Sequence, residues 1–220
     1  MPFGFLKRKP AEIAPAPVEP VAPPEPDPLH RGAPRGVAFT AITEDWRLRG
    51  RMEITGRLSD ALNRREAIAI SDVSWGPPAA GAELDPAPGL RSVAPYDLIL
   101  VTAGEDSLPP LTDTERAALK VHKVPYSVGL EVPPFRVVGT VYMHPGTEPE
   151  RLLDRSTEMF VPVVDAVAHF GDATVSDEGA EVILVNRFYL RGVEQVDLAT
   201  GEAVDPQPGG PPADRDPERR

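Results

Sequence analysis

The chain has 220 residues with a formal net charge of −11, and it contains no cysteine. The lack of cysteine excludes disulfides, thiolate metal sites and a cysteine nucleophile. The acidic balance disfavours a nucleic-acid partner, because phosphate neutralisation by lysine and arginine supplies most of the affinity of nucleic-acid-binding proteins. We therefore expect no nucleic acid among the partners.

The N-terminal residues contain aromatics and positive charges ahead of a proline-rich stretch. Residues 1–34 are rich in proline, alanine and glutamate, and we predict a disordered, semi-stiff tail. Its tip combines Phe3, Phe5 and Leu6 with the basic residues 7–9. We interpret the tip either as a short docking peptide or weak membrane attachment, or as an unstructured end with chance aromatics.

The first half of the folded part, residues 35–104, is predicted to be a β unit. Residues 37–42 and 46–55 show partial alternation, which is typical of a hairpin. We expect Trp46 and Met52 to lie on the buried face of the second strand. A short helix should follow Gly56, with Ser59 or Asp60 at its start. Residues 67–73 and 91–102 are predicted as further strands, separated by a proline- and glycine-rich loop.

The same order of patterns returns in residues 123–199, after a linker (105–122) with a short predicted helix. Trp46-Arg47-x-x-Gly50 is matched by Phe135-Arg136-x-x-Gly139, and Asp72 is matched by Asp165. Residues 92–101 likewise match residues 184–193. This recurrence indicates a duplication. Residues 200–220 return to proline, glycine and aspartate and are predicted to be a disordered tail.

These patterns predict a mainly β fold of the β-rich α+β kind. We expect two tandem small β-barrels or curled sheets, each with a short helix. A small β unit has little core and exposes its strand edges, so two such units should pack together as a pseudo-dimer within the chain.

The repeated segments resemble a bacterial domain family of unknown function that often occurs in tandem. The resemblance rests on an aromatic-R-x-x-G strand, an R-L-S-D-x-L-N turn at residues 57–63, an apolar strand ending at Asp72, and the V-N-R strand at residues 185–187. The first copy has Ala94–Pro95 where the second has Asn186–Arg187, and the second lacks the RLSD residues. The family implies a fold but no activity, substrate or cofactor. A looser likeness is to Sm-like and SH3-like small barrels, which by itself does not carry function.

Motifs for catalysis are missing from the sequence. The four histidines do not form an HExxH pattern, and neither GxxxxGK[ST] nor GxSxG occurs. We therefore expect no enzyme, no metal site and no cofactor. Two hypotheses remain open for Asp72 and Asp165: they meet as an acid–base pair, or each ends its strand and bonds backbone amides in the following turn.

Several residues are candidates for binding. Arg47, Arg49 and Arg51 alternate along one strand, so they form either a solvated face paired with nearby acids or a docking strip for an anion. Trp75 is either a core residue or an exposed aromatic anchor. Asn63, Arg64, Asp154 and Arg155 either end a short helix or form a recognition loop. The resemblance further singles out Asn186 and Arg187 as a candidate pair.

The function that follows is a non-catalytic interaction or adaptor protein of an uncharacterised family, with a protein partner. The alternative is a regulatory domain that binds a small anionic, nucleotide-like ligand through the arginine-lined sheet face. No apolar run reaches the roughly 18 residues that span a bilayer. The charged residues follow a very short apolar start, which is the reverse of a signal peptide's order. We therefore expect a cytoplasmic protein.

Overall fold

The computed structural model describes residues 34–79, 81–104, 107, 123–176 and 182–204. This part of the chain is mainly β, as the sequence predicts, and its strands form an antiparallel sheet of 12 strands. The sheet is open, with β12 at one end of the strand order and β4 at the other. One continuous sheet therefore replaces the two closed barrels that were one of the expected architectures. The duplication and the pseudo-dimer stay predictions.

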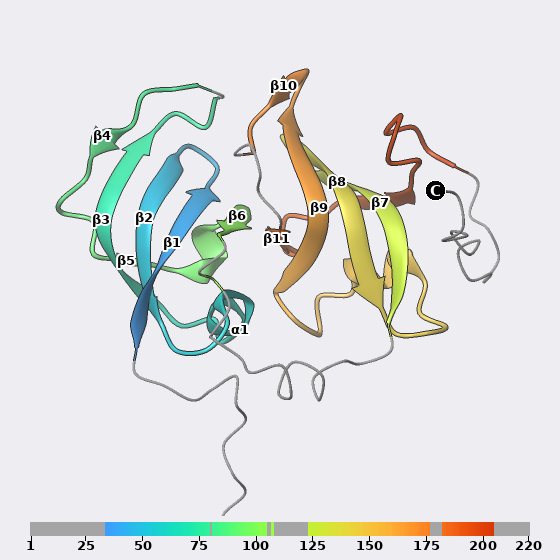
Figure 1. The fold of residues 1–220 in the computed structure, drawn as a ribbon, viewed down its shortest axis with the longest axis horizontal. Helices are drawn as coiled ribbons and strands as arrows, with labels where there is room; N and C mark the ends of the chain where they lie inside the picture. Colours follow the sequence, from blue (N-terminus) through green and yellow to red (C-terminus); the bar gives the residue numbers. More distant parts are fainter. Residues whose placement is uncertain (1–33, 80, 105–106, 108–122, 177–181, 205–220) are drawn as a thin grey trace, which may run out of the picture.

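The first half of the sheet comes from residues 35–103 and lies on the left of Figure 1. Its elements are β1 (Arg35–Ile42), β2 (Arg47–Ile54), α1 (Leu58–Asn63), β3 (Ile68–Gly76), β4 (Asp85–Pro86), β5 (Ser92–Val93), η2 (Pro95–Asp97) and β6 (Leu100–Ala103). Strands β4 and β5 pair with opposite ends of β3.

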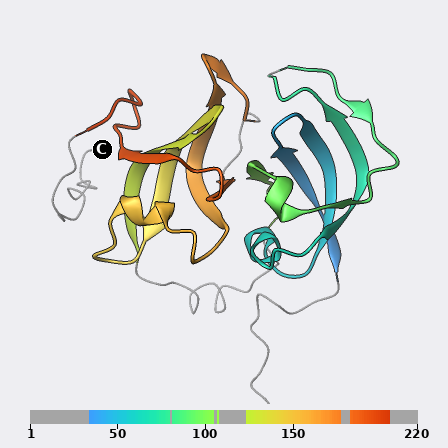
Figure 2. The same cartoon turned by 180° about the vertical axis from the view of Figure 1, so that it is seen from behind.

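The second half comes from residues 124–195 and lies on the right of Figure 1. Its elements are β7 (Val124–Val132), β8 (Phe135–Met143), η4 (Pro149–Leu153), β9 (Phe160–Phe170), β10 (Ala173–Thr174), β11 (Val182–Asn186) and β12 (Gly192–Gln195). Strand β12, which is red, crosses behind the other strands of this half and is seen more fully from the back in Figure 2.

Strand order is the same in the two halves. The order β6-β1-β2-β3 of the first half is repeated as β12-β7-β8-β9 in the second, and β11 joins them by pairing with both β9 and β6. The joining ladder runs from Leu100↔Val185 to Ala103↔Val182. The two halves are thus continuous through backbone hydrogen bonding, not only through side-chain contact.

Each half contains a β-bulge that faces a glycine. The register shifts between Arg49 and Arg51 on β2, and between Val138 and Thr140 on β8, so Gly50 and Gly139 each face the extra residue of the next strand. A Cβ on Gly50 would come within 2.8 Å of the Ser71 carbonyl oxygen, and a Cβ on Gly139 within 2.7 Å of Val163 Cγ1. Glycine is therefore required at both positions by the close approach of the bulged strand.

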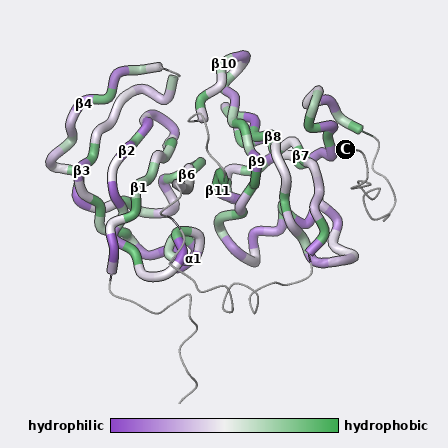
Figure 3. Tube along the Cα trace, viewed as in Figure 1, coloured by the Kyte–Doolittle hydropathy of each residue, from purple (hydrophilic) through white to green (hydrophobic). Residues whose placement is uncertain are grey.

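The strands bury their apolar residues in two cores, and each core takes residues from both halves. The first core is built around β1, β2, β3 and α1, and it includes Met159, Phe160 and Leu184 from the second half. The second is built around β7, β8 and β9 and includes Ile42, Ile99 and Leu100 from the first half. Hydrophobic and hydrophilic positions interchange along the strands in Figure 3, as one-sided burial of a sheet requires.

Some predictions for single helices and strands are confirmed and others are wrong. The predicted short helix is present and buries Leu58, Ala61 and Leu62, but its N-cap residue is Arg57, not Ser59 or Asp60, and no side chain caps it. The stretch 91–102 is not one strand, because Pro95–Asp97 forms a 3₁₀ turn between β5 and β6. Proline at the start of that turn lacks the N–H that a continuous strand would need. The N-terminal tip, the helix predicted in the linker and most of both predicted tails lie outside the described residues.

Candidate binding site

Two tryptophans, one just before β2 and one on β3, stack on the surface of the first half. The ring centroids of Trp46 and Trp75 lie 4.8 Å apart with the planes inclined by 18°, and the side chains are 43% and 39% exposed. Leu48 pairs directly with Trp75 across β2 and β3, so Trp46, two residues before Leu48, is a diagonal neighbour on the same face. The prediction that Trp46 is buried is therefore wrong.

The reason for the exposure lies in the turn between β1 and β2. Trp46 precedes the first paired residue of β2, and the β1–β2 ladder ends at Ile42↔Arg47. The Thr43 N–H donates to the Trp46 carbonyl at 2.8 Å, and the Trp46 N–H donates to the Thr43 hydroxyl at 3.0 Å. The turn thus fixes Trp46 beyond the end of the core, where Trp75 is its aromatic partner.

A pocket of about 470 Å³ opens beside these rings, and we call it the tryptophan pocket. All the charged residues in its described lining are acidic: Glu44, Asp45 and Asp97. Its lining is completed by neutral side chains from the β1–β2 turn, β2, β3, the β5 region and the second half: Thr43, Trp46, Leu48, Trp75, Leu90, Ser92, Val93, Ala94 and Tyr189. The pocket therefore combines exposed aromatic rings with negative charge.

Tyr189 is the second half's contribution to the tryptophan pocket. Its hydroxyl donates to the Tyr96 carbonyl at 3.3 Å, which holds it against the 3₁₀ turn of the first half. Partial burial raises the pKa of Tyr189, and the negative charges of Glu44 and Asp97 raise it further. The negative charges of Glu44 and Asp97 therefore both reach the Tyr189 hydroxyl at the rim of the pocket.

The three candidate arginines of β2 do not form one exposed strip. Arg47 is only 9% exposed, whereas Arg49 and Arg51 are exposed. Arg51 donates from Nη2 to the Gly36 carbonyl on β1. An anion on this face would therefore meet two exposed guanidinium groups instead of three, and binding of an anion there stays a hypothesis.

Both asparagines of the chain join the halves. Asn186 is fully buried, and its Nδ2 donates to the Leu98 carbonyl at 2.7 Å while its Oδ1 accepts from the Phe188 N–H at 3.0 Å. Asn63, at the end of α1, accepts from the Phe160 N–H at 2.7 Å. Their side-chain bonds give both residues a structural role, and Asn186 has no surface to offer a ligand.

Arg187 lies at a second pocket, of about 410 Å³, in the second half. Its Nη1 donates to the Asp154 carbonyl at 2.9 Å and also to the Thr157 hydroxyl. These bonds hold the segment before β9 in place. Burial lowers the pKa of Arg187, which the charges of Glu158 and Asp154 partly oppose. Unlike the tryptophan pocket, this pocket has charged lining residues of both signs: Lys123, Arg151, Asp154, Glu158 and Arg187.

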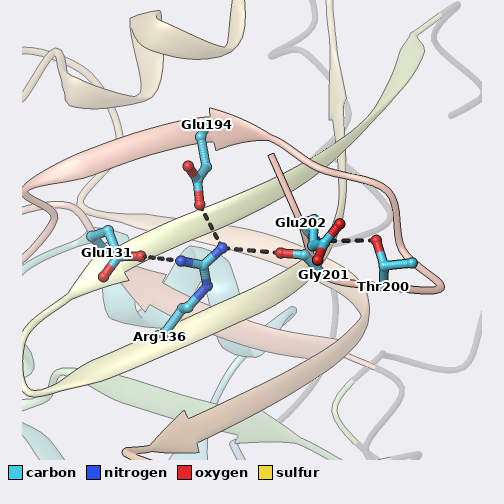
Figure 4. A network of polar contacts seen from close by, with 6 residues as sticks. All are labelled: Glu131, Arg136, Glu194, Thr200, Gly201 and Glu202. Carbon is cyan, nitrogen blue, oxygen red and sulfur yellow. Dashed lines mark hydrogen bonds and ion pairs between the residues drawn. The ribbon is translucent and has the colours of Figure 1, made fainter. Parts of the chain in front are cut away.

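An ion-pair network links β7, β8 and β12 at one end of the sheet (Figure 4). Arg136 on β8 pairs through Nη1 with Glu131 at 2.8 Å and through Nη2 with Glu194 on β12. Its Nη2 also donates to the Gly201 carbonyl at 3.2 Å. The arginine of the aromatic-R-x-x-G motif therefore fastens β7, β12 and the turn after β12 to β8.

Asp72 and Asp165 lie within β3 and β9, so neither residue ends its strand as one of the two hypotheses had it, and the acid–base pair stays a hypothesis. Both side chains are exposed, and each residue sits at its bulge with a positive φ, 51° and 50° respectively. Neither carboxylate lines either of the two pockets. Across the described ranges no group of three or more histidine, aspartate and glutamate side chains is placed to hold a metal, and no helix is long and apolar enough to cross a membrane.

Sequence reasoning singled out Trp75 but missed its neighbours in the tryptophan pocket. Alternation assigns Trp46 to the core, and none of the acids Glu44, Asp45 and Asp97 is among the predicted site residues. The signal that was available was the run Glu44–Asp45–Trp46, an aromatic directly after two acids in a turn. Tyr189 could not be found in this way, because only the joining of the halves brings it there.

Comparison with protein-family models, curated proteins and solved structures finds no match to this chain. The resemblance to a tandem bacterial family therefore stays a prediction that rests on the motifs alone. The geometry of the described residues carries the functional argument by itself.

Proposed function

We propose that this chain is a non-catalytic protein-interaction module, an adaptor, whose contact surface is centred on Trp46 and Trp75. The observation that carries the proposal is the stacked, exposed pair of indoles beside a pocket. Tryptophan is enriched among the few interface residues that supply most of the binding energy, because it buries a large rigid surface and retains a polar N–H.

The surroundings of the pair support a protein partner. Tyr96 is 48% exposed and packs on Phe188 at a centroid distance of 5.9 Å, while Tyr189 bonds its carbonyl. Aromatic residues from both halves thus lie around one pocket. A cluster of large exposed aromatics with a polar rim is typical of protein interfaces.

Photo-crosslinking in cells tests this proposal. Asp85 on β4 is exposed and pairs directly with Trp75, so a benzoylphenylalanine at this position reports on anything bound at the pair. Asp172, exposed in the β9–β10 turn of the other half, is the matched control position. We expect a discrete crosslinked partner from Asp85 but not from Asp172, and its loss in the double variant Trp46→Ala/Trp75→Ala. Equal products from the two positions, or a product that survives the double variant, would contradict the proposal.

The alternative, binding of a small anion by the sheet face, is favoured by one observation: Arg49 and Arg51 are both exposed on β2. Two cations at alternate positions of one strand lie on the same face and favour a doubly charged ligand. Titration calorimetry with pyrophosphate tests it. Binding that is lost in Arg49→Glu/Arg51→Glu would support this alternative, and no heat with the wild-type chain would dismiss it for this ligand.

A further inference from the structure

We infer that the tryptophan pocket is a receptor for a cationic side chain, an arginine of the partner protein. This inference rests on the proposed function and names the chemistry that the contact surface selects. Its starting point is the combination of two stacked indoles with the carboxylates Glu44, Asp45 and Asp97 around one cavity.

The charge of the pocket favours a cationic occupant. Every charged residue in the described lining is negative, and no described lysine or arginine lines the pocket to neutralise it. The acids come from two separate segments, the β1–β2 turn and the 3₁₀ turn before β6, and both segments face Tyr189. Burial raises the pKa of Tyr189, and the charges of Glu44 and Asp97 raise it further, so both carboxylates act at the rim of the pocket.

The aromatic surface of the pocket also favours a cation. A cation over the face of an indole is attracted by the ring's quadrupole, and tryptophan gives the strongest attraction among the aromatic side chains. The pair is stacked near parallel, and each side chain keeps about two-fifths of its surface exposed. A guanidinium can stack on such a surface while its edge donates to a carboxylate.

Arginine suits this pocket better than other cationic side chains do. Its planar guanidinium presents five N–H donors, pairs with carboxylates in a two-point geometry and loses less hydration than an ammonium group. The pocket volume, about 470 Å³, lies within the roughly 300–1,000 Å³ of sites that enclose small ligands. A guanidinium and part of its stem can therefore enter together with a neighbouring side chain.

The test uses the full-length, ¹⁵N-labelled chain and two synthetic peptides. The chain has two tryptophans, so both indole N–H signals in its NMR spectrum come from this pair. One probe is acetyl-Gly-Ala-Arg-Ala-Gly-amide, and the other replaces arginine by citrulline, which keeps the shape and removes the charge. We expect the arginine peptide to shift both indole signals and to bind about tenfold more tightly than the citrulline peptide, with an affinity that falls as salt is added.

A pair of charge variants completes the test. Glu44→Gln/Asp97→Asn removes two carboxylates from the pocket, and Glu150→Gln/Asp172→Asn removes two exposed carboxylates elsewhere. The first variant should weaken the arginine peptide about tenfold and leave the citrulline peptide unaffected, while the second should bind as the wild type does. Equal affinity for the two peptides, or equal weakening by the two variants, would overturn the inference.

Two outcomes separate this inference from its premise. If the Asp85 crosslink persists while the peptides bind equally, the interaction module stands and the arginine receptor falls. If the crosslink is absent as well, both fall. The triple variant Lys7→Gln/Arg8→Gln/Lys9→Gln, measured without peptide, gives a last comparison. If its indole signals differ from those of the wild type, the chain's own N-terminal residues fill the pocket and the partner's arginine is ruled out as its occupant.

Discussion

Asp72 and Asp165 hold the same unusual backbone conformation at the same place in the two halves. Their φ angles are 51° and 50°, and each lies at a bulge opposite a glycine, Gly50 or Gly139. Aspartate tolerates the left-handed region better than most residues because its short side chain can bond locally. The geometry of two bulged strands therefore gives both aspartates a structural explanation.

The glycines opposite the bulges should be intolerant of a side chain. Gly50→Ala and Gly139→Ala should each lower the free energy of unfolding by about 1–3 kcal/mol, because the new Cβ meets atoms at 2.8 Å and 2.7 Å. Urea denaturation measures this. Gly89→Ala is the control, since no atom lies within 4 Å of its Cβ position, and it should change stability by less than ~0.5 kcal/mol. Equal effects at all three glycines would contradict the bulge account.

The link between the halves through Asn63 should be measurable. Asn63→Ala leaves the buried Phe160 N–H without its side-chain partner and should lower the free energy of unfolding by about 1–3 kcal/mol. Asn63→Asp keeps an oxygen for that N–H and should cost less. Thermal unfolding followed by circular dichroism gives both values. If the aspartate variant is as unstable as the alanine variant, the bond to Phe160 is not the reason that asparagine is needed.

Arg136 should matter more for local order than for global stability. Its ionic partners are over a third exposed, so Arg136→Met should lower the free energy of unfolding by less than ~1 kcal/mol. Loss of the bond to Gly201 should nevertheless speed amide exchange across residues 197–204. Hydrogen exchange read by mass spectrometry tests this, with the exposed Arg64→Met as control. Unchanged exchange in that segment would show that the network does not hold it.

Asp154 should titrate at unusually low pH. The Ser156 N–H, at 2.9 Å, and then the Ser156 hydroxyl hold the pKa of Asp154 below its ordinary value. Because the pKa is lowered in the folded state, the ionised group adds stability above the ordinary aspartate pKa, and this is lost as pH falls through the lowered value. Ser156→Ala keeps the backbone donor, so a carboxyl NMR titration should show the pKa rising only part of the way. No rise, or the same rise with Ser74→Ala, would be inconsistent with this cause.

The local elements could be predicted because strand alternation and turn residues are encoded nearby in the chain. The helix after Gly56, the strand pairs and the equivalence of Asp72 with Asp165 all follow from short patterns. The joining of β6 to β11 could not, because pairing between strands some 80 residues apart has no local signal. That joint decides whether the result is two barrels or one open sheet.

The candidate site was predictable only in part for the same reason. Alternation assigns Trp46 to the face that carries Leu48 and Met52, but it does not show that Trp46 lies just before the strand and outside the core. The Asn-Arg dipeptide alone likewise does not indicate whether its asparagine side chain is exposed or buried. Asn186 proved to be a buried link between the halves, and Arg187 pins a loop.

The most direct measurement for the interaction surface is hydroxyl-radical footprinting of the two tryptophans, in the cell and on the purified chain. The account predicts that Trp46 and Trp75, 43% and 39% exposed in the isolated chain, become protected in the cell, while Tyr142, 49% exposed in the other half, is oxidised equally in both settings. Equal oxidation of both tryptophans in the two settings would contradict the claim that a partner binds there.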